Sequence, residues 1–184
     1  MAKVIVWNLV TLDGFYEGEK KWDLEFHNRA WGGELEAMAN EFGDKAGLLV
    51  FGRVTYEGMR DYWTAAEPST ITTYMNALPK LVASRTQSMS EWNNTVMTAD
   101  IDAEIARRRK APGKDVYVFG SAELSHSLMG AGLVDEVMLC VVPVTLGKGN
   151  RFFKGGAPLD FDLLEARPLS NGSVILRYKP RNAD

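Results

Sequence analysis

Runs of apolar residues alternate along this chain with stretches in which apolar residues recur every three or four positions. Runs of roughly four to eight apolar residues predict buried strands, and the wider spacing predicts amphipathic helices. The expected strands are 3–10, 48–52, 79–83, 96–98 and 115–120, and the expected helices are 33–42, 55–62, 71–77, 100–110 and 122–131. Strands and helices thus alternate over most of the chain, which favours a parallel sheet.

The rhythm changes after residue 136. Three further strands are expected at 137–144, 159–167 and 173–179, with no long helix between them. Such connections favour antiparallel pairing. The sequence also contains no internal repeat and no interdomain linker. The pattern therefore predicts one α/β domain over residues 1–184, with a mixed, mostly parallel central sheet that ends in antiparallel strands.

Three of the expected strands end in small, hydroxyl-bearing or basic residues. These are Gly52, Arg53 and Thr55 after the second strand, Ser84, Arg85 and Thr86 after the third, and Gly120 and Ser121 after the fifth. Thr55 and Ser121 are the expected N-caps of the helices that follow, and Asp100 is the expected N-cap of helix 100–110. A strand that turns directly into a helix presents unpaired N–H groups and the positive end of the helix dipole, so these junctions suit phosphates. On spacing alone, a plain turn with a solvated Arg53 is an equally good interpretation of the first junction.

The composition narrows the range of partners. The chain has 184 residues, of which 46% are hydrophobic, a net charge of −3 and a pI near 5.5. A nucleic-acid or anionic-membrane surface is therefore not expected. The single Cys140 lies in an apolar run, where we expect a core residue without a disulfide. Because no leader or membrane span is recognisable, we expect a soluble cytoplasmic protein.

Several common site chemistries have no support in the sequence. Gly147 and Gly149 are not part of a dinucleotide fingerprint, and the P-loop pattern is absent. His27 and His126 lie far apart without the spacing of a metal site, so no metal is expected. His126 falls opposite the apolar face of its expected helix, and we interpret it as a solvated side chain.

A polar loop and three tryptophans are candidates for a pocket. Residues 11–21 form a loop long enough to cover a ligand. Trp7, Trp22 and Trp31 are candidates to stack on a flat heterocycle, although aromatic residues in such positions are more often part of the core.

Four segments of the chain carry a family pattern. They are TLDGF at 11–15, GRVTYEGM at 52–59, FGSAELSHSLMGAGLVDEV at 119–137 and VTLGKGNRFF at 144–153. In this order they resemble the dihydrofolate reductase-like family, and most closely the branch related to the C-terminal reductase domain of the bifunctional riboflavin-biosynthesis deaminase-reductase. The resemblance implies a three-layer αβα fold with a nicotinamide cofactor, usually NADPH, across the carboxyl edge of the sheet.

The resemblance assigns cofactor contacts position by position. The phosphate-binding turn of the family is matched by Gly52, Arg53 and Thr55, and the segment near the adenosine ribose by Ser84, Arg85 and Thr86. The junction under the pyrophosphate is matched by Gly120, Ser121, Ala122, Glu123 and Leu124. The mobile loop beside the nicotinamide is matched by Thr11 and Gly14. Two arginines and no strand-end carboxylate at these places favour NADP over NAD, because cations bind the 2′-phosphate.

The implied activity is hydride transfer to a small heterocycle that resembles a pterin or an aminopyrimidine. The candidate catalytic residues are Asp13, Asp23 and Tyr56, with His27 as a further candidate proton donor. Members that act on a phosphoribosyl-pyrimidine carry basic residues around the first strand. This strand offers no Arg, so the substrate stays open. A non-catalytic nucleotide-binding or regulatory module on the same fold is the alternative.

The oligomeric state is predicted from the last strands. Strands 137–144 and 173–179 are rich in Val, Ile and Leu, and we expect them at the edge of the sheet. Bare edge strands expose pairing groups and apolar side chains, so we expect a homodimer that covers them.

Overall fold

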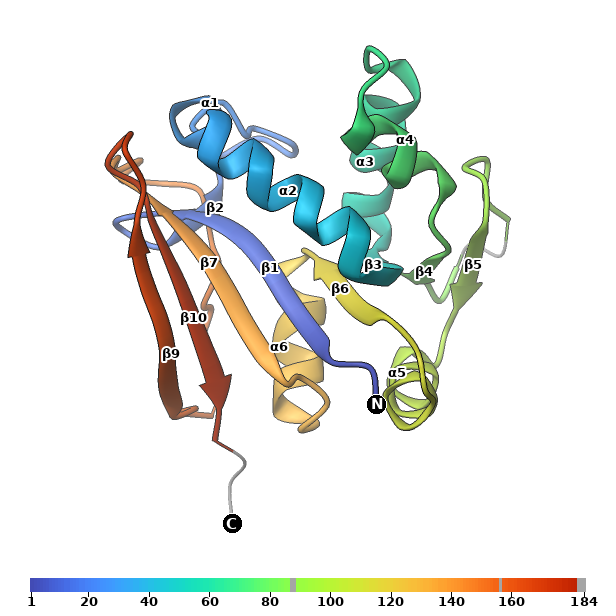
Figure 1. The fold of residues 1–184 in the computed structure, drawn as a ribbon. Coiled ribbons are helices and arrows are strands. Elements are labelled where there is room, and N and C mark those ends of the chain that lie inside the picture. Colours follow the sequence, from blue (N-terminus) through green and yellow to red (C-terminus); the bar gives the residue numbers. More distant parts are fainter. Residues whose placement is uncertain (87–88, 156, 182–184) are drawn as a thin grey trace.

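The computed structural model describes residues 1–86, 89–155 and 157–181 of the chain. A sheet of eight strands lies between two layers of helices (Figure 1). The strands of this sheet are β1 (Val4–Thr11), β3 (Ala46–Gly52), β4 (Lys80–Ala83), β5 (Thr95–Thr98), β6 (Asp115–Phe119), β7 (Glu136–Val142), β9 (Phe161–Pro168) and β10 (Val174–Pro180), and β2 (Phe15–Glu17) pairs with β8 (Asn150–Arg151) in a separate small sheet. The helices are α1 (His27–Ala30), α2 (Gly33–Lys45), α3 (Arg53–Ala65), α4 (Thr70–Ala77), α5 (Ile101–Lys110) and α6 (Ala122–Gly130).

The strand order of the large sheet is β5-β4-β3-β6-β1-β7-β10-β9. The first six strands run parallel, whereas β10 runs antiparallel to both β7 and β9. The mostly parallel sheet with antiparallel C-terminal strands is therefore confirmed. The first strand of the chain takes a central place, where Trp7 lies opposite Phe119 of β6 on one side and Met138 of β7 on the other.

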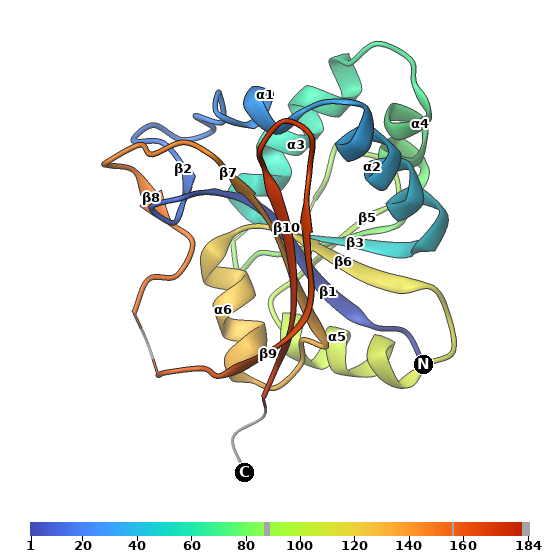
Figure 2. The same ribbon diagram turned by 60° about the vertical axis from the view of Figure 1, so that its left-hand side comes forward.

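Alternate side chains of the central strands enter two separate cores. Ile5 and Trp7 of β1 pack in the core on the side of α2, whereas Val4 and Val6 pack in the core that contains Leu128 of α6. The views in Figures 1 and 2 agree that α1 to α4 cover one face of the sheet and α5 and α6 the other. Both faces are buried because both carry apolar side chains, and the expected three-layer αβα fold is confirmed.

The helix starts are partly as expected. Asp100 caps α5 by accepting from the Ala103 N–H at 3.2 Å, and Ser121 caps α6 by accepting from the Leu124 N–H at 3.5 Å. The N-cap prediction for Thr55 is wrong, because α3 begins at Arg53 and Gly52 is its N-cap. The extended Gly52 turns directly into the helix, so the first turn of α3 has no side-chain cap.

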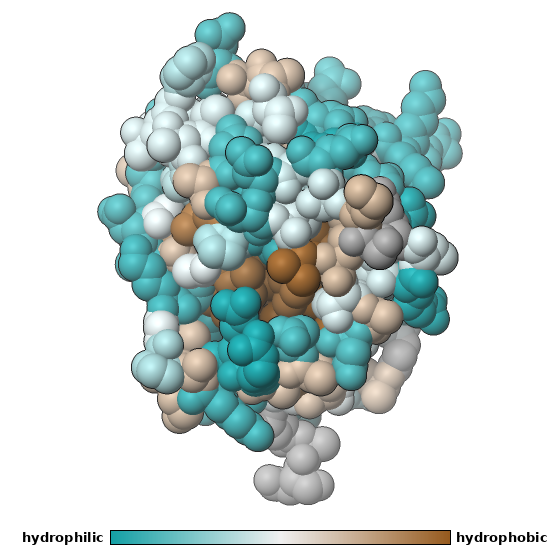
Figure 3. Space-filling view, turned by 90° about the vertical axis from the view of Figure 1, so that its right-hand side faces the viewer, coloured by the Kyte–Doolittle hydropathy of each residue, from teal (hydrophilic) through white to brown (hydrophobic). Residues whose placement is uncertain are grey.

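The expected sheet edges are wrong. β7 lies between β1 and β10, and β10 lies between β7 and β9, so the two strands at the edges are β5 and β9. On the β5 side, a hollow with apolar residues lies among hydrophilic ones (Figure 3), and Val96 of β5 is 61% exposed. At the other edge, Leu163 and Leu164 of β9 are exposed.

Two single residues test the sequence interpretation further. Cys140 is buried in the core as expected, and burial raises the pKa of its thiol to about 11. The interpretation of His126 as solvated is wrong, because its ring stacks on Phe153 with centroids 5.6 Å apart and its Nε2 is buried. The physical reason is that the residues after β8 return over this face of α6.

Candidate active site

The starts of α3 and α6 meet at the carboxyl edge of the sheet. The Gly52 N–H donates to the Gly120 carbonyl at 3.4 Å, and a Cβ on Gly52 would lie 2.9 Å from the Ser121 hydroxyl. Gly120 has a φ of +60°, and a Cβ on it would lie 3.4 Å from the Thr55 side chain. A side chain at either glycine would therefore fill the space between the two helix starts. The first N–H groups and the positive dipole ends of both helices lie at this junction, which makes it a suitable place for an anion.

The basic residues lie beside this junction. Gly52 of β3 pairs in register with Ala83 of β4, so Ser84, Arg85 and Thr86 leave the sheet next to the start of α3. Arg85 is exposed, and Arg53 is half exposed in an ion pair with Glu57 at 2.8 Å. Both guanidinium groups therefore lie at the outer side of the helix junction, where solvent can reach them.

A cavity of about 230 Å³ opens next to the junction. Eight of its 22 lining residues are aromatic. The lining consists of the aromatic residues Trp7, Tyr16, Trp22, Trp31, Phe42, Trp63, Tyr74 and Phe119, the polar residues Asn8, Glu17, His27, Thr55 and Ser121, and Leu9, Leu24, Leu35, Ala39, Val54, Met59, Ile71, Met75 and Gly120.

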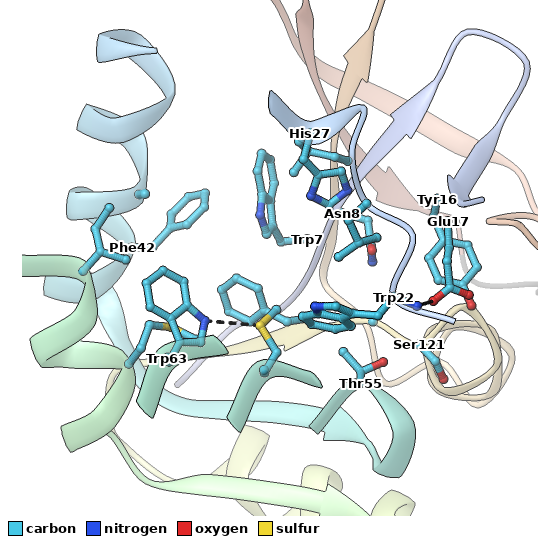
Figure 4. A pocket seen from close by; sticks show the side chains of 18 of the residues that line it. Trp7, Asn8, Tyr16, Glu17, Trp22, His27, Phe42, Thr55, Trp63 and Ser121 are labelled. Carbon is cyan, nitrogen blue, oxygen red and sulfur yellow. Dashed lines mark hydrogen bonds between the residues drawn. The ribbon is translucent and has the colours of Figure 1, made fainter. Parts of the chain in front are cut away.

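The cavity has two unlike ends (Figure 4). Phe42 and Trp63 stand at one end, and the Trp63 indole N–H lies 3.3 Å from the Met59 sulfur. Tyr16, Glu17, Thr55 and Ser121 stand at the other end, with Trp7 and Trp22 between the two groups (Figure 4). A flat molecule between these aromatic side chains would have its polar edge toward the helix junction.

Trp22 is held in place by its backbone and by a glycine. Its φ is 65°, and its backbone N–H donates to the Glu17 carboxylate at 2.6 Å. Its ring packs on Gly58 of α3 so closely that a Cβ there would lie 2.3 Å from the ring. The second Glu17 oxygen accepts from the Asn150 side chain at 2.8 Å. Glu17 therefore connects the loop that carries Trp22 to β8.

Two polar atoms in the wall are buried without a hydrogen bond to any described residue. They are Asn8 Nδ2 and His27 Nε2. Burial lowers the pKa of His27 to about 4, so its imidazole is neutral at neutral pH. The Asn8 side-chain oxygen lies 3.8 Å from where a Cβ on Gly120 would be, which places this amide beside the helix junction. An unpaired buried amide is costly, and a bound ligand can satisfy it.

The predicted cofactor residues are only partly brought together. Gly52, Thr55, Gly120 and Ser121 lie at the junction. Ala122 and Leu124 are buried in the first turn of α6, Glu123 is exposed there, and Ser84, Arg85 and Thr86 lie to one side. Thr11 and Gly14 lie outside the cavity wall, in a turn where the Gly14 N–H donates to the Thr11 carbonyl at 2.9 Å.

The three candidate catalytic residues also lie outside the cavity wall. Desolvation opposes ionisation of Asp13, but hydrogen bonds from Thr11, Gly147 and Leu146 outweigh it and lower its pKa. Asp23 is exposed in the loop before α1. Tyr56 is buried in the core, where its hydroxyl accepts from the Trp92 N–H at 3.2 Å. Their catalytic assignment stays a prediction.

The sequence interpretation found part of the wall and missed the rest. Trp7, Trp22 and Trp31 all line the cavity, as does His27. Asn8, Tyr16, Glu17, Phe42 and Trp63 were not identified as site residues. One signal was present, because Asn8 is the only polar residue between Val4 and Val10, at the centre of an otherwise apolar strand.

The architecture and the helix junction define a class of protein. The sheet order and layers belong to the dihydrofolate reductase-like fold, as expected. The chain belongs to the RibD C-terminal domain family, whose model matches residues 2–175. This is a family of reductases that act on small molecules, and a reductase-like role follows from membership.

Known relatives cover the chain almost completely. It is 28% identical to the uncharacterized protein YyaP of Bacillus subtilis (strain 168), over 96% of this chain and 94% of that protein. Its structure is similar to that of a protein from Shewanella sp. PV-4 described as a riboflavin biosynthesis protein, with a TM-score of 0.74 and 18% identity. The match covers 99% of this chain and 100% of that one. It also matches RibD of Acinetobacter baumannii with a TM-score of 0.69 and 16% identity, over 99% of this chain and 59% of that one.

Two further observations concern metal ions and membranes, and both apply to the described residues. These residues contain no group of three His, Cys, Asp or Glu side chains that could hold a metal ion. Each helix in residues 1–86, 89–155 and 157–181 is too short or too polar to cross a membrane.

Proposed function

We propose that the protein is an NADPH-dependent reductase that transfers hydride to a small heterocyclic substrate. The observation that carries this proposal is the continuity of the helix junction at Gly52 and Gly120 with a cavity lined by aromatic side chains. The junction has the space and the N–H groups for the pyrophosphate. The cavity has the flat walls for a nicotinamide ring beside a flat acceptor.

The residues at the junction fit the proposed cofactor. Gly52, Thr55, Gly120 and Ser121 would hold the pyrophosphate, and Arg53 with Arg85 would bind the 2′-phosphate that distinguishes NADPH from NADH. The buried and unpaired Nδ2 of Asn8, beside Gly120, supports the binding of the nicotinamide amide. When bound, the cofactor supplies the hydride.

The side chains of the cavity then have three tasks. The aromatic wall orients a flat substrate, which turns an encounter between two molecules into a reaction within one complex. The same wall excludes water from the transferred hydride. Thr55 and Ser121 form the polar edge of the cavity beside the junction, where they would orient the polar groups of the ligand (Figure 4). The predicted roles of Asp13, Asp23 and Tyr56 as proton donors are tested by their amide or phenylalanine variants.

Calorimetric titration with NADPH and with NADH tests the proposal. We expect micromolar binding of NADPH and much weaker binding of NADH. Arg53→Ala is expected to weaken NADPH binding about tenfold or more, because a charge-assisted contact to phosphate is lost. The matched control is Arg107→Ala, since Arg107 also forms an ion pair on a helix, with Glu104 at 2.7 Å, but lies on α5. Equal affinity of Arg53→Ala and the control would contradict the assignment.

The alternative is a nucleotide-binding or regulatory module on the same fold. It predicts NADPH binding without oxidation of the cofactor in the presence of pterins, aminopyrimidines or related heterocycles. A place for the chain in riboflavin biosynthesis predicts turnover of a phosphoribosyl-aminopyrimidine.

We also propose a cytoplasmic homodimer, supported by the exposed Leu163 and Leu164 on the edge strand β9. A monomer in sedimentation at micromolar concentration would contradict the dimer.

A further inference from the structure

The charges around the cavity are unusual for a site that binds a phosphorylated substrate. Among the described residues that line it, none is a lysine or an arginine, and Glu17 is the one carboxylate. A phosphate enclosed here would be desolvated next to a negative charge, without a cation to offset the cost. The cavity therefore disfavours an anionic substrate.

Glu17 also lacks a cation of its own. Its two oxygens accept from the Trp22 N–H at 2.6 Å and from the Asn150 side chain at 2.8 Å, and both donors are neutral. No ion pair of Glu17 occurs within the described parts of the chain. The carboxylate thus adds an unbalanced negative charge to a wall of electron-rich rings. Both features attract a flat cation, through Coulomb attraction and through the faces of Trp7, Trp22 and Tyr16.

The wall also lacks an effective acid. His27 is neutral, and its buried Nε2 has no partner. The Tyr74 hydroxyl donates to the Ala39 carbonyl at 2.9 Å. Burial, with the nearby carboxylates of Glu17 and Glu123, raises the pKa of Tyr16 to about 12, so Tyr16 holds its proton more firmly than a free tyrosine. A neutral imine or ketone needs a proton when it accepts hydride, and this wall is poorly equipped to give one.

We propose that the substrate is a flat cyclic iminium cation without a phosphate, which binds with its positive nitrogen toward Glu17. This inference rests on the proposed function for the source of hydride. The carbon of the C=N⁺ bond receives hydride from the reduced nicotinamide, a C–H bond forms, and the π electron pair becomes the lone pair of a neutral amine. The nicotinamide is oxidised and the iminium reduced. Charge and atoms balance without a proton, so the reaction needs no acid from the wall.

Quenching of tryptophan fluorescence measures the charge preference without the cofactor, because four tryptophans line the cavity. The probe is the 2-methyl-3,4-dihydroisoquinolinium cation, and its carbon isostere, 3-methyl-1,2-dihydronaphthalene, has nearly the same shape without the charge. We expect the cation to bind about tenfold or more tightly than the isostere. Equal affinities, or binding of neither compound, would overturn the inference.

The variant Glu17→Gln tests the carboxylate itself. It is expected to lose most of the preference for the cation while its affinity for the isostere changes little. The matched control is Glu19→Gln, since Glu19 lies two residues away, outside the cavity wall, in an ion pair with Lys148 at 2.8 Å. If Glu17→Gln does not fold, the comparison of cation and isostere with the unaltered protein still decides.

Turnover separates this inference from the proposed function. With NADPH present, we expect the cation to be reduced to 2-methyl-1,2,3,4-tetrahydroisoquinoline, with loss of nicotinamide absorbance. Binding of NADPH without preference for the cation would refute the iminium substrate alone. Binding of the cation without binding of NADPH would refute the reductase and leave the charge preference of the cavity in place.

Discussion

His27 should make the protein less stable as the pH falls below neutrality. The histidine opens α1, and its ring meets Phe26 edge-on with centroids 4.6 Å apart. Burial lowers its pKa from 6.5 to about 4. Between these two values, the unfolded chain binds a proton at His27 that the folded protein does not. The free energy of the unfolded state therefore falls relative to that of the folded state as the pH falls through this window, and the protein loses stability.

The size of the effect follows from the shift in pKa. A difference of 2.5 units between the two states corresponds to about 3.4 kcal/mol when the pH has fallen below both values. About 2 kcal/mol of this should already be lost between about pH 7.5 and about pH 5. The contribution of His27 to stability is fully present above the pKa of the unfolded state. It is completely lost below the pKa of the folded state, where a further fall in pH changes nothing at His27.

Urea unfolding of the protein and of His27→Gln over this range measures the effect. Carboxylates that titrate in the same range contribute to both proteins, so the difference between the two curves isolates His27. We expect His27→Gln to lose less stability on acidification by about 2 kcal/mol. The control is His126→Gln, which changes the second of the two histidines in the chain. Parallel curves for the protein and His27→Gln would refute the reasoning.

Two further substitutions test packing and a buried charge. Gly58→Ala should displace Trp22, because the new Cβ would lie 2.3 Å from its ring. We expect altered tryptophan fluorescence and weaker binding of flat ligands, whereas Gly130→Ala on α6, with nothing within 4 Å, is the unaffected control. Glu136→Gln should reduce the free energy of unfolding by about 1–3 kcal/mol, since the buried carboxylate pairs with Lys3 and Arg177, each at 2.6 Å. Urea unfolding measures the loss, and a change under about 0.5 kcal/mol would show that these ion pairs contribute little.

The sequence predicted the features that depend on neighbours along the chain. Apolar runs identified the strands of the parallel sheet, and Asp100 and Ser121 were recognised as caps because each acts on an N–H three residues ahead. Thr55 was a misleading signal. Its residue type suits a cap, but the helix starts two residues earlier at Arg53, where Gly52 ends the strand.

The features that depend on distant segments could not be predicted. The order of strands decides which of them lie at an edge, and neither β7 nor β10 shows in its own residues that another strand lies beside it. The cavity wall likewise combines residues from 7–42, 54–75 and 119–121. Trp63 and Phe42 follow the ordinary spacing of helix core residues. Only the packing of α2 and α3 against α4 shows that they also face a cavity.

The central position of β1 bears on how the chain folds during synthesis. β1 (Val4–Thr11) leaves the ribosome early, but its two partners are β6 (Asp115–Phe119) and β7 (Glu136–Val142). At typical rates of translation, the last of these residues follows on the order of ten seconds later. Both edges of this apolar strand are unpaired until β6 is made, and one edge stays unpaired until β7 follows. Because the pairings at the centre of the sheet are distant in sequence, folding should be slow and should finish only after most of the chain has been made. Binding of β1 by a chaperone during this interval would protect the nascent protein from aggregation.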